Sequence, residues 1–158
     1  MIHKPVDADN ETIANLLDAA FAPSQYESTL RATIKNLERP HLEWVMEGDD
    51  RIVCHILYSQ ATDDSGTFIG YHLAPIAIHP DYQKRGLGTQ LIKETLTNEA
   101  LASESIFVLG DPQFYKRLGF AETTSAQCPF DENNQHFRAL RWHDRERPFT
   151  IGYDPAFG

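Results

Sequence analysis

Hydrophobic residues recur along the chain with two different spacings, which divide it into predicted helices and strands. Between residues 9 and 21 the apolar positions follow the 3.6-residue period of a helix, and a second helix is expected over about 26–37. Apolar runs over about 42–47, 51–60 and 67–79 are separated by short turns rich in Gly and Asp. These runs predict three strands that are joined as an antiparallel meander.

The second half of the chain alternates helix and strand. The pattern predicts a short strand over 1–6 and then, after the meander, a helix over about 86–99, a strand over 104–110, a short helix over 112–118 and a last strand over 136–143. A helix that connects two strands is typical of a crossover, so the strands before and after the first of these helices should be parallel. The expected fold class is α/β, or α+β, with a mixed and mostly antiparallel central sheet and about four flanking helices.

Pro75 interrupts the predicted strand 67–79. Proline has no N–H to donate to a neighbouring strand, so it indicates a bulge or a point where the strand parts from its neighbour. The alternative is that Pro75 simply ends the strand early.

Length and composition indicate one globular domain. A chain of 158 residues can bury about 68–70% of its unfolded surface, so we expect a single domain over 1–158. The formal net charge is −9, from 14 Lys and Arg against 23 Asp and Glu. Long-range electrostatics therefore disfavour nucleic acid and anionic membrane as partners, and they favour a cationic partner such as an amine.

The sequence carries no sign of export or of a metal. No run approaches the ~20 apolar residues of a membrane-spanning helix, and the N-terminus lacks the apolar core of a signal peptide. Cys54 and Cys128 lie far apart, which is typical of free thiols in a reducing compartment, and the histidines form no metal-binding motif. We therefore expect a cytoplasmic protein without a metal.

The segment after the third long strand has the chemistry of a pyrophosphate site. It reads Q-K-R-G-L-G from Gln83 to Gly88 and leads directly into a helix. Glycines let a ligand approach the main chain, and the free N–H groups of a helix N-terminus carry the equivalent of roughly half a positive charge. Lys84 and Arg85 add two formal charges. A dinucleotide fingerprint would need a third glycine at Leu91, and the six letters alone describe a plain turn equally well.

A second segment, S-I-F-V-L-G-D-P-Q-F-Y-K-R-L-G-F from Ser105, combines an apolar strand with a short helix whose two ends are marked. Asp111 suits the N-cap, Pro112 the first helical position and Gly119 the left-handed position after the helix. The helix defined in this way carries Tyr115.

The two segments together resemble the GNAT superfamily of N-acetyltransferases. Q-x-x-G-x-G is similar to the loop with which these enzymes bind the pyrophosphate of acyl-CoA, and F-Y-x-x-x-G-F is similar to a segment that follows it in them. The pairing of L-A-P-I-A-I-H-P with V-L-G-D-P-x-x-Y resembles the bacterial YhbS-type branch. The resemblance implies a sheet splayed between its fourth and fifth strands, with the pantetheine arm of acetyl-CoA in the gap.

The resemblance also implies which residues bind acetyl-CoA. Backbone groups at the splay would pair with the pantetheine arm, while the loop and the start of its helix would hold the pyrophosphate. In this sequence these positions are Ile76, Ala77, Ile78, Gln83, Lys84, Arg85, Gly86, Leu87, Gly88 and Thr89. Many GNAT enzymes have an asparagine near the position of Val108 that supports the pantetheine arm, and this chain has none.

Acetyl transfer from a thioester to an amine requires two proton transfers. A lysine-like amine with a pKa near 10.4 must lose a proton, at a cost of about 4.6 kcal/mol at pH 7, and the departing CoA thiolate must gain one. The resemblance gives the donor role to Tyr115, since a tyrosine stays protonated at neutral pH. His72 is the candidate base, with His55 and Glu43 as alternatives. Tyr115 as a core residue and His72 as a structural hydrogen-bonding group are the competing interpretations.

The sequence therefore favours an acetyl-CoA-dependent N-acetyltransferase that acts on a primary amine by direct attack in a ternary complex. The acceptor stays open among small amines, amino acids, aminoglycosides, and protein N-termini or lysines. Two alternatives are a non-catalytic module that binds or senses acyl-CoA, and an N-acyltransferase for a longer acyl group. The aromatic tail of Phe149, Tyr153 and Phe157 would cover either the core or the surface of a homodimer.

Overall fold

Three long antiparallel strands form the centre of the computed structural model, which describes residues 1–158. They are β2 (His41–Gly48), β3 (Arg51–Thr62) and β4 (Phe68–Ile78). The β2–β3 hairpin turns through Asp49 and Asp50, whose φ angles of 52° and 60° are both positive. Two positive φ angles match the right-handed twist of the flanking strands, and Asp adopts them readily. The predicted meander is confirmed.

Three shorter strands extend the sheet on both sides. β1 (Ile2–His3), β5 (Ile106–Leu109) and β7 (Phe137–Leu140) complete the order β1-β2-β3-β4-β5-β7. Only the β4–β5 pair is parallel, so the sheet is mixed and mostly antiparallel, as expected. The last strand ends at Leu140, before the predicted 143, because Arg141 has a φ of 57°. A separate two-stranded parallel sheet of β6 (Ala126–Gln127) and β8 (Phe149–Thr150) was not predicted, since two-residue strands leave no periodic pattern.

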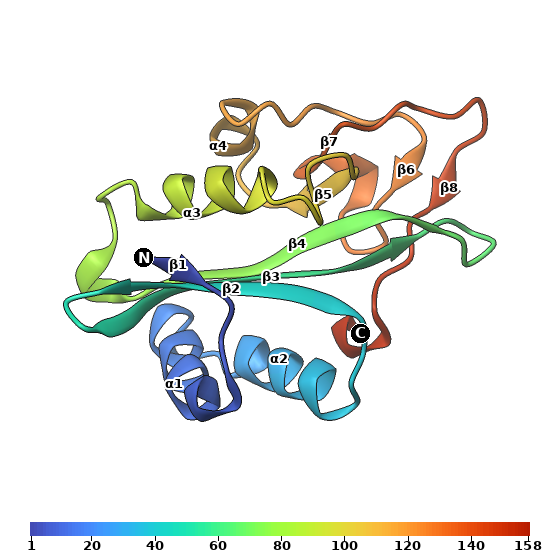
Figure 1. Ribbon diagram of the computed structural model, residues 1–158. Coiled ribbons are helices and arrows are strands. Elements are labelled where there is room, and N and C mark those ends of the chain that lie inside the picture. Colours follow the sequence, from blue (N-terminus) through green and yellow to red (C-terminus); the bar gives the residue numbers. More distant parts are fainter.

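Four helices cover the two faces of the central sheet (Figure 1). α1 (Asn10–Ala20) and α2 (Tyr26–Asn36) lie on one face, and α3 (Leu87–Leu96) and α4 (Pro112–Lys116) lie on the other. Ile13, Leu16 and Leu17 of α1 pack against Val45, Ile52 and Ala77, whereas α3 contributes Leu91, Ile92 and Leu96 to the largest core cluster. The sheet is thus buried on both faces, and no helix is long and apolar enough to cross a membrane.

A buried ionic network fixes α2 to the sheet. The Arg31 guanidinium donates to both Glu43 carboxylate oxygens at 3.1 and 2.9 Å, and the His55 Nε2 atom lies 2.8 Å from Glu43 Oε2. Burial favours the neutral acid, yet hydrogen bonds from His41, His55 and Arg31 hold the pKa of Glu43 well below its usual range. His55 and Glu43, the two alternative bases, therefore belong to a structural network.

The C-terminal segment runs from β8 past the sheet to α2 (Figure 1). It ends in a short 3-10 helix (Pro155–Phe157), where the Phe157 carbonyl accepts a hydrogen bond of 2.9 Å from the Tyr26 hydroxyl. Phe149 and Tyr153 pack in one core cluster, and Phe157 packs against another, which includes Leu30 of α2. The aromatic tail thus covers the core of this chain. The two cysteines are free and buried.

Candidate active site

The central sheet opens where β4 and β5 part. The two strands pair only at Tyr71 with Ile106 and at His72 with Phe107. Between Leu73 and Ile76, β4 carries one more residue than β3 does between Tyr58 and Ile56, which makes a bulge. Pro75 lies in this bulge, and its missing N–H removes one donor from the ladder. The strand continues to Ile78, so the alternative that Pro75 ends it early is wrong.

A cavity of about 330 Å³ follows the splayed end of β4 into the loop before α3. Its lining includes nine of the ten residues predicted to bind acetyl-CoA, from Ile76 to Thr89. Gly86 has a φ of 77° and is the N-cap of α3, so that the first N–H groups of the helix lack helical partners there. A Cβ at Gly88 would lie 3.2 Å from the Ile78 side chain, which explains the second glycine as a close contact between helix and strand. The cavity is thus lined mainly by one continuous segment, which includes the N-terminus of α3.

Arg85 is the predicted residue that does not line this cavity. Its guanidinium donates to the Asp81 carbonyl oxygen at 3.0 Å and lies 5.0 Å from the centre of the Tyr82 ring. Lys84, in contrast, is exposed, lines the cavity and has a φ of 63°. Arg85 therefore shapes the loop, and Lys84 is the cation that the loop offers to a ligand.

A second group of cations lies further along α3. A cavity of about 210 Å³ is lined by Thr89, Lys93, Phe114, Arg117 and Leu118. It shares Thr89 and Phe114 with the loop cavity. Lys93 and Arg117 are exposed and make no ion pair within the protein. The sequence analysis missed this site, although Thr89 and Lys93 are four residues apart and so lie on one face of the helix.

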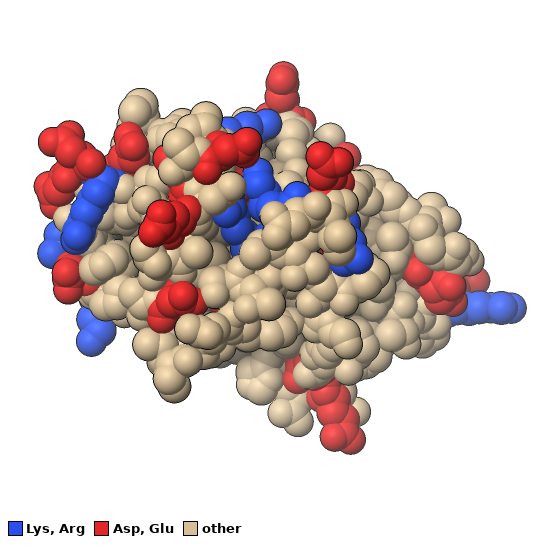
Figure 2. Space-filling view, turned by 90° about the horizontal axis from the view of Figure 1, so that it is seen from below, with Lys and Arg blue, Asp and Glu red and all other residues tan.

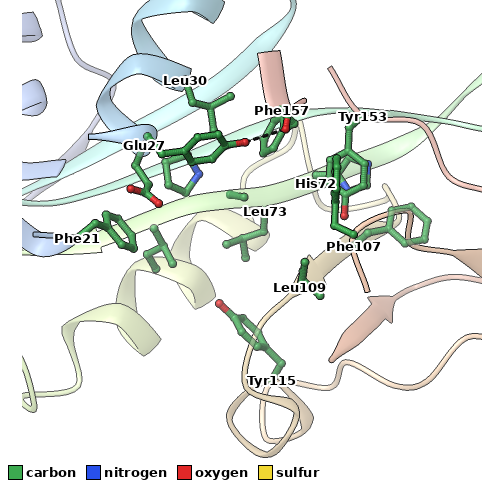
Figure 3. Close-up of a pocket in the computed structure, with 15 residues that line it drawn as sticks. Phe21, Glu27, Leu30, His72, Leu73, Phe107, Leu109, Tyr115, Tyr153 and Phe157 are labelled. Atoms are coloured by element: carbon green, nitrogen blue, oxygen red, sulfur yellow. Dashed lines mark hydrogen bonds between the residues drawn. The ribbon is translucent and has the colours of Figure 1, made fainter. Parts of the chain in front are cut away.

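The largest of the three cavities, about 430 Å³, lies at the other end of the gap (Figure 3). It shares Phe21 and Ile76 with the loop cavity, so the three cavities are neighbours along one path. Its lining comes from α2, β4, β5, α4 and the C-terminal segment and is mostly hydrophobic. The side chains labelled in Figure 3 are Phe21, Glu27, Leu30, His72, Leu73, Phe107, Leu109, Tyr115, Tyr153 and Phe157.

Tyr115 projects into this large cavity from α4. Asp111 caps the helix by accepting a hydrogen bond of 3.0 Å from the Gln113 N–H, as predicted. A Cβ at Gly110 would lie 2.7 Å from the Tyr115 ring, so only glycine leaves the ring its place. The hydroxyl is directed toward the middle of the cavity (Figure 3), and burial together with the nearby Asp111 raises its pKa to about 12. At neutral pH this group is therefore a protonated donor.

His72 is part of the cavity wall, and it is held there by two contacts. Its Nε2 atom lies 2.9 Å from the Gly152 carbonyl oxygen, and its ring stacks on Tyr153 with 3.6 Å between ring centres. Burial lowers its pKa to about 4. A neutral ring that donates from Nε2 carries its lone pair on Nδ1, which is buried and has no hydrogen-bond partner. This geometry suits a positioning residue better than a base.

Glu27 is a cavity residue that the sequence analysis did not select. It lies in the first turn of α2, and its Oε1 atom accepts a hydrogen bond of 3.0 Å from the Ser24 hydroxyl. Figure 3 shows Glu27 and Tyr115 on opposite sides of the same cavity. Glu27 is the only carboxylate in the lining, which contains no Lys or Arg. No local motif marks it, because the cavity brings α2 close to α4 only in the folded chain.

The splayed mixed sheet and the loop that opens into a helix define a GNAT-type fold. The chain belongs to the GNAT family of acetyltransferases, a group of acyltransferases. The family model of the acetyltransferase (GNAT) domain matches residues 40–122, slightly more than half of the chain. The matched part contains β4, the loop, α3 and Tyr115.

Individual relatives agree with this family. The chain is 31% identical over 118 residues to the uncharacterized N-acetyltransferase YjhQ of Escherichia coli, a match that covers 72% of this chain and 65% of YjhQ. It is 34% identical over 108 residues to YhbS of the same species, covering 58% of this chain and 59% of YhbS. The chain thus matches just under two thirds of the length of these relatives.

Solved structures extend the likeness to the whole chain. A GNAT acetyltransferase from Brucella melitensis, crystallised with acetyl-CoA, superposes with a TM-score of 0.82 at 27% identity and covers 100% of this chain and 97% of its own. Escherichia coli YhbS in complex with CoA has a TM-score of 0.87 at 23% identity, and the match covers 99% of this chain and 91% of that one. At 23% identity, the similarity to YhbS shows a shared fold alone.

Proposed function

We propose that the protein transfers the acetyl group of acetyl-CoA to a primary amine by direct attack within a ternary complex. The observation that carries the proposal is the path of three neighbouring cavities, which begins at Lys93 and Arg117 and ends at Tyr115. Its cationic end suits the phosphorylated adenosine, its backbone-lined middle suits the pyrophosphate and pantetheine, and its apolar end can receive the acetyl group and an acceptor. The Brucella melitensis relative was crystallised with acetyl-CoA, which supports the choice of ligand.

The chemistry needs a donor where the thioester would lie. In the proposed step the neutral amine nitrogen attacks the thioester carbon, an N–C bond forms, and the C–S bond breaks with its electron pair on sulfur. Tyr115 gives its hydroxyl proton to the sulfur and regains a proton from the amine nitrogen through water. With a pKa near 12 the phenol is a weak acid, so we expect proton transfer to accompany the bond cleavage.

No strong base is needed inside the cavity for this step. His72 stays a candidate base, but a pKa of about 4 makes it a weak one, and its buried Nδ1 atom faces no open water. We propose that the incoming amine loses its first proton to solvent at the mouth of the cavity. The acetylation rate should then rise with pH until the amine itself is neutral.

The first experiment is calorimetric titration with acetyl-CoA, CoA and dephospho-CoA, followed by thiol release from acetyl-CoA with a panel of amines. Binding with amine-dependent thiol release is the expected result. Binding without release for any amine would favour the alternative of an acyl-CoA sensor, and no binding would remove the proposal. Propionyl-CoA and octanoyl-CoA serve as competitors, because an apolar cavity of about 430 Å³ would also fit a longer acyl chain.

We also propose that residues 1–158 work as one catalytic domain in the cytoplasm. Two free, buried cysteines fit a reducing compartment, and burial raises the pKa of the Cys54 thiol to about 11, which keeps it unreactive. Fractionation of cells that express the tagged protein would test the location.

A further inference from the structure

The walls of the large cavity are strongly apolar. Of the 15 lining residues, 12 are hydrophobic, and aromatic rings dominate from several segments of the chain. The opening is apolar too, since Tyr26, Leu109 and Phe130 are among the few large hydrophobic side chains exposed on the surface, at 50%, 42% and 53%. An exposed apolar rim around an apolar cavity is typical of a binding site for an apolar ligand.

The large cavity has few charged groups, and they restrict which ligands can bind. Glu27 offers one carboxylate, and only its Oε1 atom has a protein partner, the Ser24 hydroxyl. His72 is neutral at pH 7, because burial lowers its pKa to about 4. No Lys or Arg lines the cavity, although unpaired cations lie along the rest of the path at Lys84, Lys93 and Arg117. A ligand with one amine group, which is drawn to the mouth of the cavity as a cation and binds as a neutral hydrogen-bond donor, and with no negative group matches this set.

We propose that the acceptor is a small apolar primary amine, an arylalkylamine or alkylamine without a carboxylate or phosphate, and that Glu27 holds its nitrogen. This inference rests on the proposed acetyl transfer and names the substrate class of that reaction. The hydrocarbon part would pack on the aromatic walls, and the nitrogen would donate a hydrogen bond to the free Oε2 atom of Glu27.

The same geometry argues against the polar acceptors. The carboxylate of an amino acid would be buried among aromatic rings without a cation, and the Tyr115 hydroxyl is engaged with the thioester sulfur in the proposed step. Burial of an unpaired charge is very costly. An aminoglycoside would lose the hydration of its many hydroxyl groups at an apolar rim. A peptide N-terminus would bring backbone polar groups to the same apolar surface, and the rim offers them few partners.

Glu27 and Tyr115 divide the work between them. Figure 3 shows the Glu27 side chain reaching the cavity from α2 while the Tyr115 hydroxyl enters from α4, with Leu73 of β4 between them in the view. An amine held on the α2 side would approach a thioester that lies along β4 next to Tyr115. Glu27 therefore binds and orients the acceptor, whereas Tyr115 acts on the departing sulfur.

A matched pair of substrates tests the inference. 2-Phenylethylamine and phenylalanine share the amine and the ring and differ by one carboxylate. We expect kcat/KM for 2-phenylethylamine to exceed that for phenylalanine by on the order of 100-fold, since the carboxylate would be buried unpaired. Hexylamine should also react, while kanamycin and a short peptide with a free N-terminus should react poorly.

A variant tests the role of Glu27. Glu27→Gln keeps the shape of the side chain and removes its charge, so KM for 2-phenylethylamine should rise about 10- to 100-fold while kcat and the affinity for acetyl-CoA change little. The exposed Glu11→Gln on α1 is the matched control and should leave KM unchanged.

The outcomes distinguish a failure of the proposed acetyl transfer from a failure of the proposed acceptor class. If acetyl-CoA does not bind, or no amine releases thiol, the proposed function fails and the acceptor class with it. If acetyl transfer occurs but phenylalanine, kanamycin or the peptide equals 2-phenylethylamine, the function stands and the acceptor class is wrong. An unchanged KM in Glu27→Gln would remove Glu27 from acceptor binding. A preference for octanoyl-CoA with small polar amines would assign the apolar cavity to the acyl chain and overturn the inference.

Discussion

The two ends of the candidate site are built in different ways. The end that would hold the cofactor is made mainly by one continuous segment, from Ile76 to Thr89, and offers backbone N–H groups and Lys84. The end that would hold the acceptor is assembled from six parts of the chain, between Phe21 and Phe157, and offers aromatic side chains and one carboxylate. Continuous backbone recognises a constant group such as a pyrophosphate, whereas assembled side chains set the choice of acceptor.

Acidic and basic side chains are mixed on the face that carries α1 and α2 (Figure 2), with basic ones both near its centre and at its edges. The unpaired cations Lys93 and Arg117 lie instead at α3 and after α4, on the opposite face of the sheet. A net charge of −9 would repel an anionic cofactor and attract an amine, so these local cations matter most for the cofactor.

The largest effect is expected at Tyr115, which lines the acceptor end. Tyr115→Phe removes only the donor, so turnover with a responsive amine should fall by roughly 100- to 10,000-fold. The affinity for acetyl-CoA should stay within about threefold, because the phenol ring keeps its packing. Steady-state thiol release and calorimetry measure the two quantities.

Tyr71→Phe is the control for this change. Tyr71 lies where β4 pairs with β5 and lines none of the three cavities, so the loss of its hydroxyl should leave turnover unaltered. Near-normal turnover in Tyr115→Phe would mean that water protonates the thiolate and that Tyr115 only lines the cavity.

The second prediction concerns the support of the acceptor end. Arg31→Met leaves Glu43 buried without its bidentate partner, so the free energy of unfolding should fall by about 3 kcal/mol. Arg39→Met, which removes the partly exposed ion pair with Asp154, should cost less than about 1 kcal/mol. Urea unfolding of both variants gives the comparison, and similar small losses would mean that the buried network does not hold α2 in place.

The contrast between the two ends also explains what the sequence could predict. The loop, the capped helix α4 and the splay at Pro75 are local features, so the caps at Asp111 and Gly119 and the bulge are confirmed. The contact of Arg85 with the Tyr82 ring could not be predicted from the six letters, and its role in binding acetyl-CoA stays a prediction. Glu27 could not be found, because most of the residues that share the cavity with it, from His72 onward, are more than 40 residues away along the chain.

The third prediction follows from the burial of His72 in the acceptor wall. Its pKa is about 4 in the folded protein against 6.5 in the unfolded chain. Between pH 6.5 and 4 the imidazole is therefore protonated in the unfolded state but neutral in the folded state, which favours unfolding. The free energy of unfolding is unaffected by this group above pH 6.5, and it falls by roughly 3 kcal/mol as the pH approaches 4. Burial also lowers the pKa of His55, which adds to the same loss.

His72→Gln isolates this contribution. Glutamine can still donate to the Gly152 carbonyl but does not titrate, so the free energy of unfolding should depend less on pH between 4 and 6.5 than it does in the unmodified protein. Exposed His136→Gln should keep the original slope. Urea unfolding at several pH values measures it, and an unchanged slope in His72→Gln would show that other groups set the acid sensitivity.

The smallest effect should arise at the far end of the cofactor path. Lys93 and Arg117 are exposed, so solvent and salt weaken the attraction of each for a phosphate. Replacing both by Met should therefore weaken CoA binding by only roughly tenfold in low salt. Dephospho-CoA should bind both forms equally well if these two cations hold the 3′-phosphate. Lys116→Met removes a neighbouring cation outside the three cavities and should change neither affinity. Equal losses for CoA and dephospho-CoA would instead place the pyrophosphate at this site, and the division between a backbone-built cofactor end and a side-chain-built acceptor end would have to be redrawn.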